Sequence, residues 1–387
     1  MNKVTQSSIE LLQQPQNASV LSIYLPTHRY PTPPHMQEDQ IRFKNLIRKA
    51  RDEWQKNSND HAVDDIYKQL EAKLDDLDFW QQATEGTAVF ASPDHIETYH
   101  LPIECEERVY VGDSYDITPL RIIMTLDQPY YLIALAMHNT KLLRGDIYGL
   151  EPVAIEFPTS PEDALNIDEM FSNSRTVRSR EGPSGADNAI SPHGQGDSSE
   201  AGREERLQYF RIIDGIIADS AVIDQTLPVL IAGTDSEAGD YKNISKLPTL
   251  LSTYLQGNHT TTPLQGLHAQ AWQIIHNEVV NKKTATAVEQ FQELRGVEKS
   301  SRDIQHITES ADAGRIGTLL VTMLRMTTDS VSDTVHTAVP IITFTENYEH
   351  GHIIELVQKV AAQGGRILGL NYDSMPEKVP VAAIYRY

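Results

Sequence analysis

Short apolar runs rich in β-branched residues alternate along this chain with longer segments in which an apolar residue recurs every three or four positions. Runs of the first kind, such as 18–26, 227–233 and 366–370, are typical of buried strands. Segments of the second kind, such as 39–56 and 203–220, are typical of amphipathic helices. Because helices must bury an apolar stripe and sheets an apolar face, the pattern predicts a mixed α/β fold in which helices cover sheets.

The order of these segments divides the 387 residues into three expected domains. An N-terminal α/β domain is expected at 1–127, a middle domain at 128–262 and a C-terminal α/β layer domain at 263–387. The middle domain contains a stretch, 158–199, in which the apolar pattern gives way to Pro, Ser, Asn, Asp, Gly and Arg. A loop of this length is usually functional, and its composition favours folding against a partner.

The segments predict the following elements. In the N-terminal domain we expect strands at 18–26, 85–92, 98–111 and 119–125, and helices at 39–56 and 63–82. In the middle domain we expect strands at 129–137, 140–148, 151–157 and 227–233, the first three as a meander, and helices at 203–220 and 241–255. In the C-terminal domain we expect helices at 265–295, 301–312 and 352–363, and strands at 315–324, 366–370 and 379–387. Gly314 and Gly364 are expected to end helices, because glycine readily adopts the left-handed backbone of a helix C-cap.

The net charge limits the partners that the whole surface can attract. The sequence has 33 basic and 54 acidic residues, which give a formal net charge of −21. Such a charge favours solubility and opposes charge-driven binding to nucleic acid in general, so DNA is not an expected partner. Contact with RNA would require local basic surfaces, with the acidic residues turned elsewhere.

The single cysteine and the lack of long apolar runs indicate a cellular compartment. Cys105 alone excludes an internal disulfide and a zinc site of several thiolates, and it suits a reducing environment. The first residues lack a signal-peptide core, and no apolar run is long enough to span a bilayer. We therefore expect a soluble, cytoplasmic protein with no membrane partner.

Sites for a metal or a nucleotide cofactor are not expected. His350, His352 and Glu355 are metal-binding residue types, but no further ligand of recognisable spacing accompanies them. The sequence also lacks the GK[ST] phosphate loop of NTPases and the Gly-x-Ser-x-Gly turn of many hydrolases.

Two local basic surfaces are candidates for RNA contact. The first combines the end of the strand at 18–26 with one face of the next helix, and its residues are Thr27, His28, Arg29, Lys44, Arg48 and Arg51. A strand-end loop beside a basic helix face can position phosphates, although a solvated amphipathic helix is the alternative. The second surface is Arg175, Arg178 and Arg180, whose guanidinium groups suit phosphates and unpaired bases. Its alternative is a solvated loop with scattered charge.

Several sequence segments occur in an order that resembles a known group of proteins. They are SIYLPTHR, QIRFKNLIRKA, TAVF, TPLRIIM, YLIALA, HGQG before a helix, AGRIGTLLV and AAIYRY. Together they resemble the bacterial branch of the archaeo-eukaryotic class-one release factor and Pelota superfamily, which includes ribosome-hibernation factors. The resemblance spans nearly the whole chain, and it depends on the ordered set rather than on one specific motif.

This resemblance implies a translation factor, roughly tRNA-shaped, that enters the ribosomal A site. The first domain would approach the decoding centre, and the loop of the middle domain would reach toward the peptidyl-transferase centre. The last domain would have a fold seen in RNA-binding ribosomal proteins and would face a translational GTPase, which in bacteria would be EF-Tu. A monomer that contacts rRNA of both subunits is the expected form.

The tip of the middle loop decides between catalysis and simple occupancy. Release factors of this superfamily carry Gly-Gly-Gln there, whereas this chain has His193, Gly194, Gln195 and Gly196. A histidine adopts positive φ at a cost that glycine does not have. The carboxylates that follow would repel rRNA phosphates unless they point away or pair with Arg203 and Arg206, and they are Asp197, Glu200, Glu204 and Glu205.

The resemblance therefore favours a hibernation factor that excludes tRNA from the A site without catalysis. Three alternatives remain open. The chain could be a release or rescue factor that hydrolyses peptidyl-tRNA, or an interaction protein unrelated to ribosomes that keeps the fold. Taken alone, the four residues 193–196 could also be only a glycine-rich connector before a helix.

Overall fold

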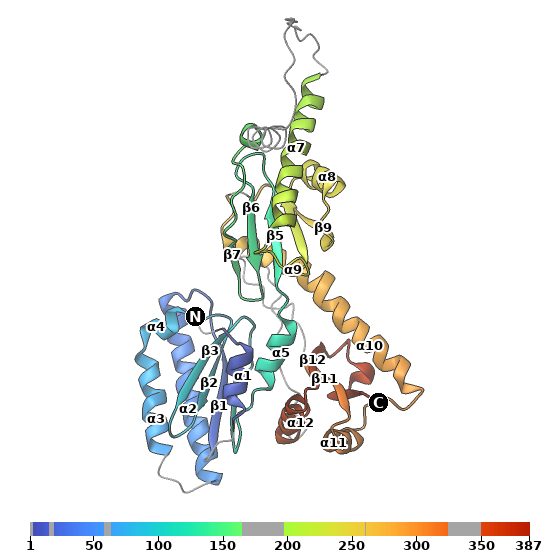
Figure 1. Cartoon of the computed structure of the whole chain (residues 1–387). Coiled ribbons are helices and arrows are strands. Elements are labelled where there is room, and N and C mark those ends of the chain that lie inside the picture. The colour runs from blue at the N-terminus through green and yellow to red at the C-terminus, as the bar shows by residue number, and fades with distance from the viewer. Residues whose placement is uncertain (1–2, 15–18, 58–62, 165–196, 260, 324–349) are drawn as a thin grey trace, which may run out of the picture. The chain divides into compact units, whose positions relative to one another are not determined.

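The computed structural model describes residues 3–14, 19–57, 63–164, 197–259, 261–323 and 350–387 (Figure 1). It divides the chain into two compact units. The first unit consists of Met1–Gln128 together with Asn277–Tyr387, and the second is Pro129–His276. The described residues form a mixed α/β protein with three sheets, which confirms the predicted fold class. The division into three domains remains a prediction.

The N-terminal part of the first unit contains a four-stranded antiparallel sheet in the order β3-β2-β1-β4. Its strands are β1 (Val20–Pro26), β2 (Gly86–Ala91), β3 (Ile96–Leu101) and β4 (Arg108–Gly112). The helices of this part are α1 (Gln6–Leu12), α2 (Pro33–Asn57), α3 (Val63–Ala72), α4 (Leu77–Gln81) and α5 (Thr118–Leu126). Ile23 of the central strand β1 pairs with Val89 on one side and Val109 on the other.

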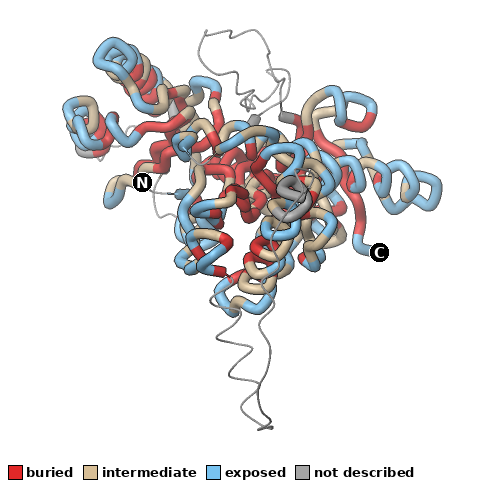
Figure 2. Tube along the Cα trace, turned by 90° about the horizontal axis from the view of Figure 1, so that it is seen from above, coloured by how far each residue is buried: buried red, intermediate tan, exposed pale blue. Residues whose placement is uncertain are grey.

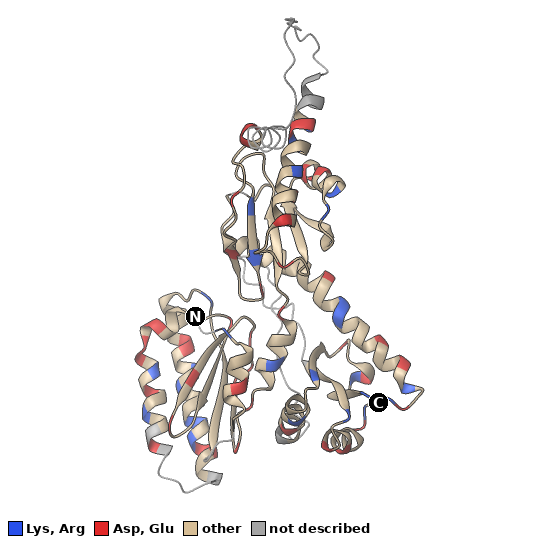
Figure 3. Ribbon diagram, in the orientation of Figure 1, with Lys and Arg blue, Asp and Glu red and all other residues tan. Residues whose placement is uncertain are grey.

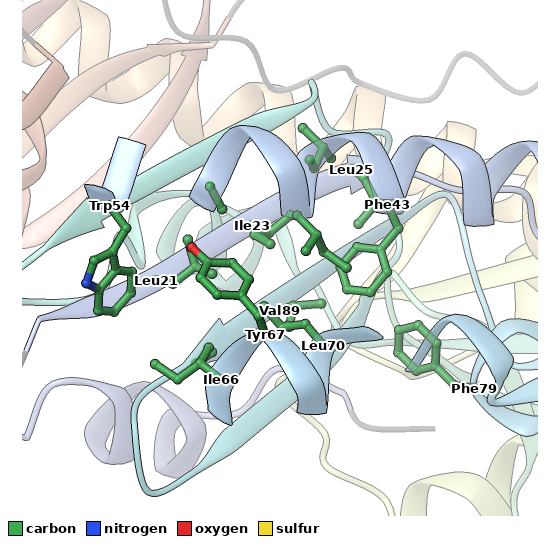
Figure 4. Packing of buried hydrophobic residues seen from close by; sticks show 14 of the residues in the cluster. Leu21, Ile23, Leu25, Phe43, Trp54, Ile66, Tyr67, Leu70, Phe79 and Val89 are labelled. Atoms are coloured by element: carbon green, nitrogen blue, oxygen red, sulfur yellow. The ribbon is translucent and has the colours of Figure 1, made fainter. Parts of the chain in front are cut away.

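One face of this sheet forms the core with α2 and α3. Alternate residues of a strand face the same side, so Leu21, Ile23 and Leu25 all point toward these helices. Phe43 of α2 and Ile66 of α3 pack against them, and both are fully buried (Figure 4). Each such side chain stabilises the fold by roughly 1.5–3 kcal/mol through its removal from water. The core therefore fixes which face of α2 remains exposed.

The segment 119–125 forms the helix α5, so the predicted strand there is wrong. Pro119 lies in the first turn of α5, where its missing N–H is tolerated. Six of the nine residues of α5 are buried. The segment is short and contains β-branched residues that are common in strands, although its less buried residues Arg121, Met124 and Thr125 lie three and four positions apart, as on one face of a helix.

The predicted helix at 63–82 is interrupted in the structure. Helix α3 ends at Ala72, a 3₁₀ turn covers Lys73–Asp75, and α4 begins at Leu77. The Asp76 side chain caps α4 by accepting a hydrogen bond from the N–H of Phe79. The break changes the direction of the chain, so Leu77 is 59% exposed instead of facing the core.

The C-terminal part of the first unit has a second four-stranded sheet, in the order β10-β13-β11-β12. Its strands are β10 (Ser300–Ser301), β11 (Ile316–Met323), β12 (Arg366–Asn371) and β13 (Val381–Tyr385). Its helices are α10 (Asn281–Arg295), α11 (Ile304–Asp312) and α12 (His350–Ala362). Gly314 (φ +67°) follows α11 and Gly364 (φ +72°) follows α12, which confirms both predicted helix ends.

Helix α12 connects the two parts of the first unit. The side-chain amide of Gln358 donates to the carbonyl oxygen of Tyr115 at 2.7 Å. The hydroxyl of Ser114 donates to Gln358 Oε1 at 3.2 Å. Residues more than two hundred positions apart in the sequence are therefore bonded inside one unit.

The second unit is a five-stranded sheet in the order β7-β6-β5-β8-β9, with helices on both faces (Figure 1). Its strands are β5 (Tyr130–Ala134), β6 (Lys141–Gly145), β7 (Leu150–Pro152), β8 (Val229–Gly233) and β9 (Leu250–Gln256). The first three form the predicted antiparallel meander, and β5, β8 and β9 run parallel. Helices α7 (Asp197–Asp219) and α8 (Asp235–Ile244) cover one face, and α9 (Leu264–Ile275) covers the other.

The predicted helix at 241–255 is only partly correct, because Leu250–Gln256 forms the strand β9. Pro248 follows α8 and disfavours helical backbone at the residue before it. Leu251 and Leu255 lie four residues apart, a spacing that suits both a helix and alternate positions of a strand. Both pack toward α9, whereas Leu250 packs on the opposite face of the sheet.

Buried positions concentrate along the strands, while the helices expose one side (Figure 2). Among the helices that the structure describes, none combines the length and the apolar character that crossing a membrane requires.

Candidate functional site

One candidate site lies directly after β1, in residues 27–35, which we name the strand-end segment. Thr27 is buried, and its N–H donates to the carbonyl oxygen of Glu85 at 3.0 Å. Its hydroxyl donates to the carbonyl oxygen of Thr84 at 2.7 Å. Thr27 is therefore an anchor that joins the segment to the chain before β2, and it is not available to an RNA ligand.

His28 is fixed by a buried carboxylate of α2. The N–H of His28 donates to Asp39 Oδ2 at 3.0 Å, and its ring Nδ1 lies 2.9 Å from Asp39 Oδ1. The Asp39 side chain is only 1% exposed, whereas that of His28 is 33% exposed. The ring of His28 stacks on that of His35, with the ring centres 4.4 Å apart and the planes inclined by 7°. An Nδ1–H bonded to a carboxylate holds the ring and leaves Nε2 for an external partner.

Arg29 is engaged by Glu85 in a two-point ion pair. Its Nε lies 2.6 Å from Glu85 Oε1, and its Nη2 lies 2.7 Å from Oε2. Burial would lower the pKa of Arg29, but the hydrogen bonds and charge of Glu85 outweigh it and raise that pKa. A guanidinium bound in this way keeps its charge and positions the chain. Arg29 thus anchors the segment rather than offering its full set of donors to a phosphate.

Tyr30, which sequence reasoning missed, is an exposed aromatic residue of this segment. Its backbone has φ +54°, and 59% of the residue is exposed. A non-glycine residue in this region costs roughly 1–3 kcal/mol and persists only where its surroundings fix it. No sequence pattern marks this conformation, because it results from the anchors on Thr27 and Arg29.

The basic face of α2 divides into exposed and paired residues. Lys44 and Arg48 are exposed, and neither makes an ion pair with another described residue. Arg51 lies 3.5 Å from Asp64, and its guanidinium is 5.6 Å from the ring centre of Tyr67. Both signs of charge occur on α2 (Figure 3). Of the predicted basic face, Lys44 and Arg48 therefore offer the unpaired charges.

The other predicted rRNA-binding surface lies outside the described residues. It includes the three arginines and the HGQG sequence, namely Arg175, Arg178, Arg180, His193, Gly194, Gln195 and Gly196. Their roles remain predictions.

The side chains of α7 are described from Gly202 onward. Arg203 and Arg206, in this part of the helix, are bound to α8. Arg203 Nε lies 3.2 Å from Asp240 Oδ1, and Arg206 Nε lies 2.9 Å from Oδ2. Burial raises the pKa of Asp240, but the hydrogen bonds from Arg206 and Arg203 outweigh it and lower that pKa below its ordinary value. Glu204 pairs with Arg211, whose Nη1 lies 3.2 Å from Glu204 Oε1, and Glu205 is exposed with no ion pair among the described residues. Among the carboxylates at the start of α7, Glu205 is therefore the one left without an ion pair in the described part of the chain.

The other metal-binding or reactive residue types, His352 and Cys105, contact or are buried in the fold. His352 Nε2 lies 3.1 Å from Thr308 Oγ1, which ties α12 to α11. Within the described ranges, no group of three or more His, Cys, Asp or Glu residues could hold a metal ion. Cys105 is fully buried, and burial raises the pKa of its thiol to about 12, so the reactive thiolate is scarce at neutral pH.

In the second unit of this α/β protein, the long helix α7 follows the loop predicted at 158–199. A long helix directly after such a loop is the arrangement expected of a release-factor-like protein. A family model described as bacterial archaeo-eukaryotic release factor family 3 matches residues 129–315. The match confirms the resemblance to the archaeo-eukaryotic release factor superfamily. The matched region covers the second unit and ends at Arg315, directly before β11.

Solved structures similar to this chain include Pelota and a translation termination factor. Pelota from Archaeoglobus fulgidus is 11% identical over 78% of this chain and 79% of that chain, with a TM-score of 0.33. A model of ribosome-bound archaeal Pelota and ABCE1 is 10% identical over 100% of this chain and 95% of that chain, with a TM-score of 0.38. The archaeal termination factor aRF1 is 12% identical over 98% and 96% of the two chains, with a TM-score of 0.24. These values are too low to carry an argument about function. No curated protein sequence matches this chain significantly.

Proposed function

We propose that this protein binds the A site of idle or stalled ribosomes and excludes tRNA sterically, as a ribosome-hibernation factor does. The family match over residues 129–315 carries the proposal. The matched region includes the loop at 158–199 and helix α7, which correspond in order to the loop and helix that bear the Gly-Gly-Gln tip in release factors.

Two features favour exclusion over hydrolysis. His193 stands where release factors have a glycine, and a histidine resists the positive φ that the tip requires. At the start of α7, Glu205 is also exposed without an ion pair among the described residues, since Arg203 and Arg206 are bound to Asp240 and Arg211 pairs with Glu204. Exposed carboxylates beside rRNA phosphates would repel them and would hinder close positioning at the catalytic centre.

The proposed partners follow from this role. They are rRNA of both subunits and a translational GTPase, for which EF-Tu is the bacterial candidate, and the protein would act as a monomer. Within the bacterial branch, the hibernation factor Balon is the relative whose role we extend to this chain.

Binding to purified ribosomes tests the proposal. We expect the full chain to co-sediment with vacant ribosomes at low salt and to reduce binding of aminoacyl-tRNA to the A site. EF-Tu is added in a parallel series, because an escort could be required for entry. A protein that ignores ribosomes in both series at low salt contradicts the proposal. Sedimentation of extracts from growing and starved cells gives a second check, since a chain that always remains at the top favours a role unrelated to ribosomes.

A release or rescue factor is the second candidate, because Gln195 still follows a glycine at the expected tip. A single-turnover release assay on stalled complexes separates the two functions, with Gln195→Ala as the matched variant. We expect no release above background from either protein. Hydrolysis that depends on Gln195 would replace exclusion with catalysis.

A further inference from the structure

Aromatic ring faces gather in the strand-end segment. Tyr30 is 59% exposed, and the rings of His28 and His35 are stacked with their centres 4.4 Å apart. His35 itself is exposed in the first turn of α2. Three aromatic side chains thus lie within eight residues at the end of one strand. Ring faces of this kind bind unpaired bases of any sequence, because every base has a π face.

The backbone holds this segment in place before any ligand arrives. Tyr30 has φ +54°, while Thr27 and Arg29 on its N-terminal side are bonded to Thr84 and Glu85. On its C-terminal side the prolines lead directly into α2. The side chain of Tyr30 also forms a hydrogen bond with Arg29, which helps to hold the ring, and a fixed ring loses less entropy when it binds a ligand.

The charges around the segment suit a phosphodiester chain. The nearby carboxylates are occupied, because Asp39 binds His28, Glu85 binds Arg29, and Glu38 binds Arg42. The exposed cations Lys44 and Arg48 lie on the same helix as His35, roughly 14 and 20 Å farther along its axis at a rise of 1.5 Å per residue. Paired carboxylates repel a phosphate less than free ones do, and unpaired cations attract it.

We propose that Tyr30 and the His28–His35 stack form a binding site for an unpaired base of single-stranded RNA, with Lys44 and Arg48 attracting phosphates farther along the strand. On the ribosome, the base would belong to an RNA strand near the A site, so in that setting the inference rests on the proposed function. The site itself requires only a single-stranded RNA.

Direct binding of the full chain to RNA tests this site. The probe is a short, fluorescently labelled, single-stranded purine RNA, and its anisotropy is followed at low salt. Tyr30→Asn removes the ring but tolerates the left-handed backbone, so the unfolding temperature should be retained. We expect Tyr30→Asn to weaken binding by roughly 5- to 150-fold, the effect of losing one stacked base, and Tyr30→Phe to restore it. His35→Ala should weaken binding in the same direction.

Tyr387→Asn is the matched control, because Tyr387 is also exposed, at 70%, and lies at the C-terminus. It should leave RNA affinity unchanged. The same variants are measured on purified ribosomes. Wild-type protein that binds ribosomes but not the RNA probe, or Tyr30→Asn with wild-type affinity for the RNA, overturns the base-binding site. Protein that ignores ribosomes but binds the RNA through Tyr30 leaves the site standing and removes only the ribosomal role. Equal loss of affinity in Tyr30→Asn and Tyr387→Asn also overturns it.

Discussion

At the scale of single residues, Thr27 shows how a candidate ligand-binding side chain can instead hold the backbone. Valine has the same shape, but it would not donate to the carbonyl oxygen of Thr84. We expect Thr27→Val to lower the free energy of unfolding by about 1–3 kcal/mol, the cost of leaving a buried acceptor unpaired. Urea denaturation measures the change. Thr27→Ser keeps the hydroxyl, so a loss as large as that of the valine variant would contradict the role of this bond.

Asp240 gives the protein a stability that depends on pH. Its pKa is lowered in the folded state, so its contribution is present above the ordinary aspartate pKa of about 3.9 and is lost as pH falls through the folded-state value. We expect Asp240→Asn to destabilise the second unit by about 1–2 kcal/mol at neutral pH, and the difference from wild type to shrink in acid. Denaturation midpoints at neutral and acidic pH measure this. A difference that grows in acid would show that the contact of Asp240 with Arg203 and Arg206 is not ionic.

The sequence predicted Thr27, His28 and Arg29 as a group, but not what they do. Their partners, Asp39 and Glu85, come from other elements, and side-chain pairing across elements leaves no periodic trace in the sequence. The same reason hides Tyr30, whose backbone is set by its neighbours' bonds. Local patterns locate polar residues, and tertiary packing decides which of them are anchors.

At the scale of elements, the basic residues of α2 look alike in the sequence but differ in the structure. Arg51 has a carboxylate partner, whereas Arg48 is exposed with no ion pair among the described residues. Arg48→Glu reverses an exposed charge that has no ion pair among described residues, and Lys49→Glu makes the same charge change one residue away on the same helix. We expect Arg48→Glu to weaken ribosome binding and to reduce the slope of log affinity against log salt by about one unit. Affinity measured over a salt series tests this. Equal effects at residues 48 and 49 would indicate a general field of charge and no specific phosphate contact.

The elements themselves were largely predictable, and the two main errors share a cause. Helix α5 was expected as a strand, and strand β9 as part of a helix. Both are short, and residues four apart fit either period. Longer amphipathic segments such as α2 and α7 were identified correctly, because an exposed polar face distinguishes the helical period. For the short elements, only their neighbours in the fold decide the backbone.

At the scale of the whole molecule, the stretch between β7 and α7 can be tested separately from the fold. Removal of residues 173–196 takes away no residue of the described cores. We expect the deletion to leave the unfolding temperature within a few degrees of wild type, while weakening ribosome binding or changing the footprint on the large subunit. Differential scanning calorimetry and chemical footprinting measure the two effects. Unchanged affinity together with an unchanged footprint would remove this stretch from the proposed function.

The first unit is discontinuous in the chain, because residues 1–128 and 277–387 fold together and 129–276 form the second unit. During synthesis, the second unit can acquire its structure as soon as it emerges. The N-terminal sheet has a core of its own within residues 21–111, but its link to α12 must wait, since the bonds between Ser114, Tyr115 and Gln358 form only after almost the entire polypeptide has left the exit tunnel. A truncated product that ends before α12 would therefore expose the surface that α12 normally covers, and such nascent fragments would be early substrates for chaperones and proteases.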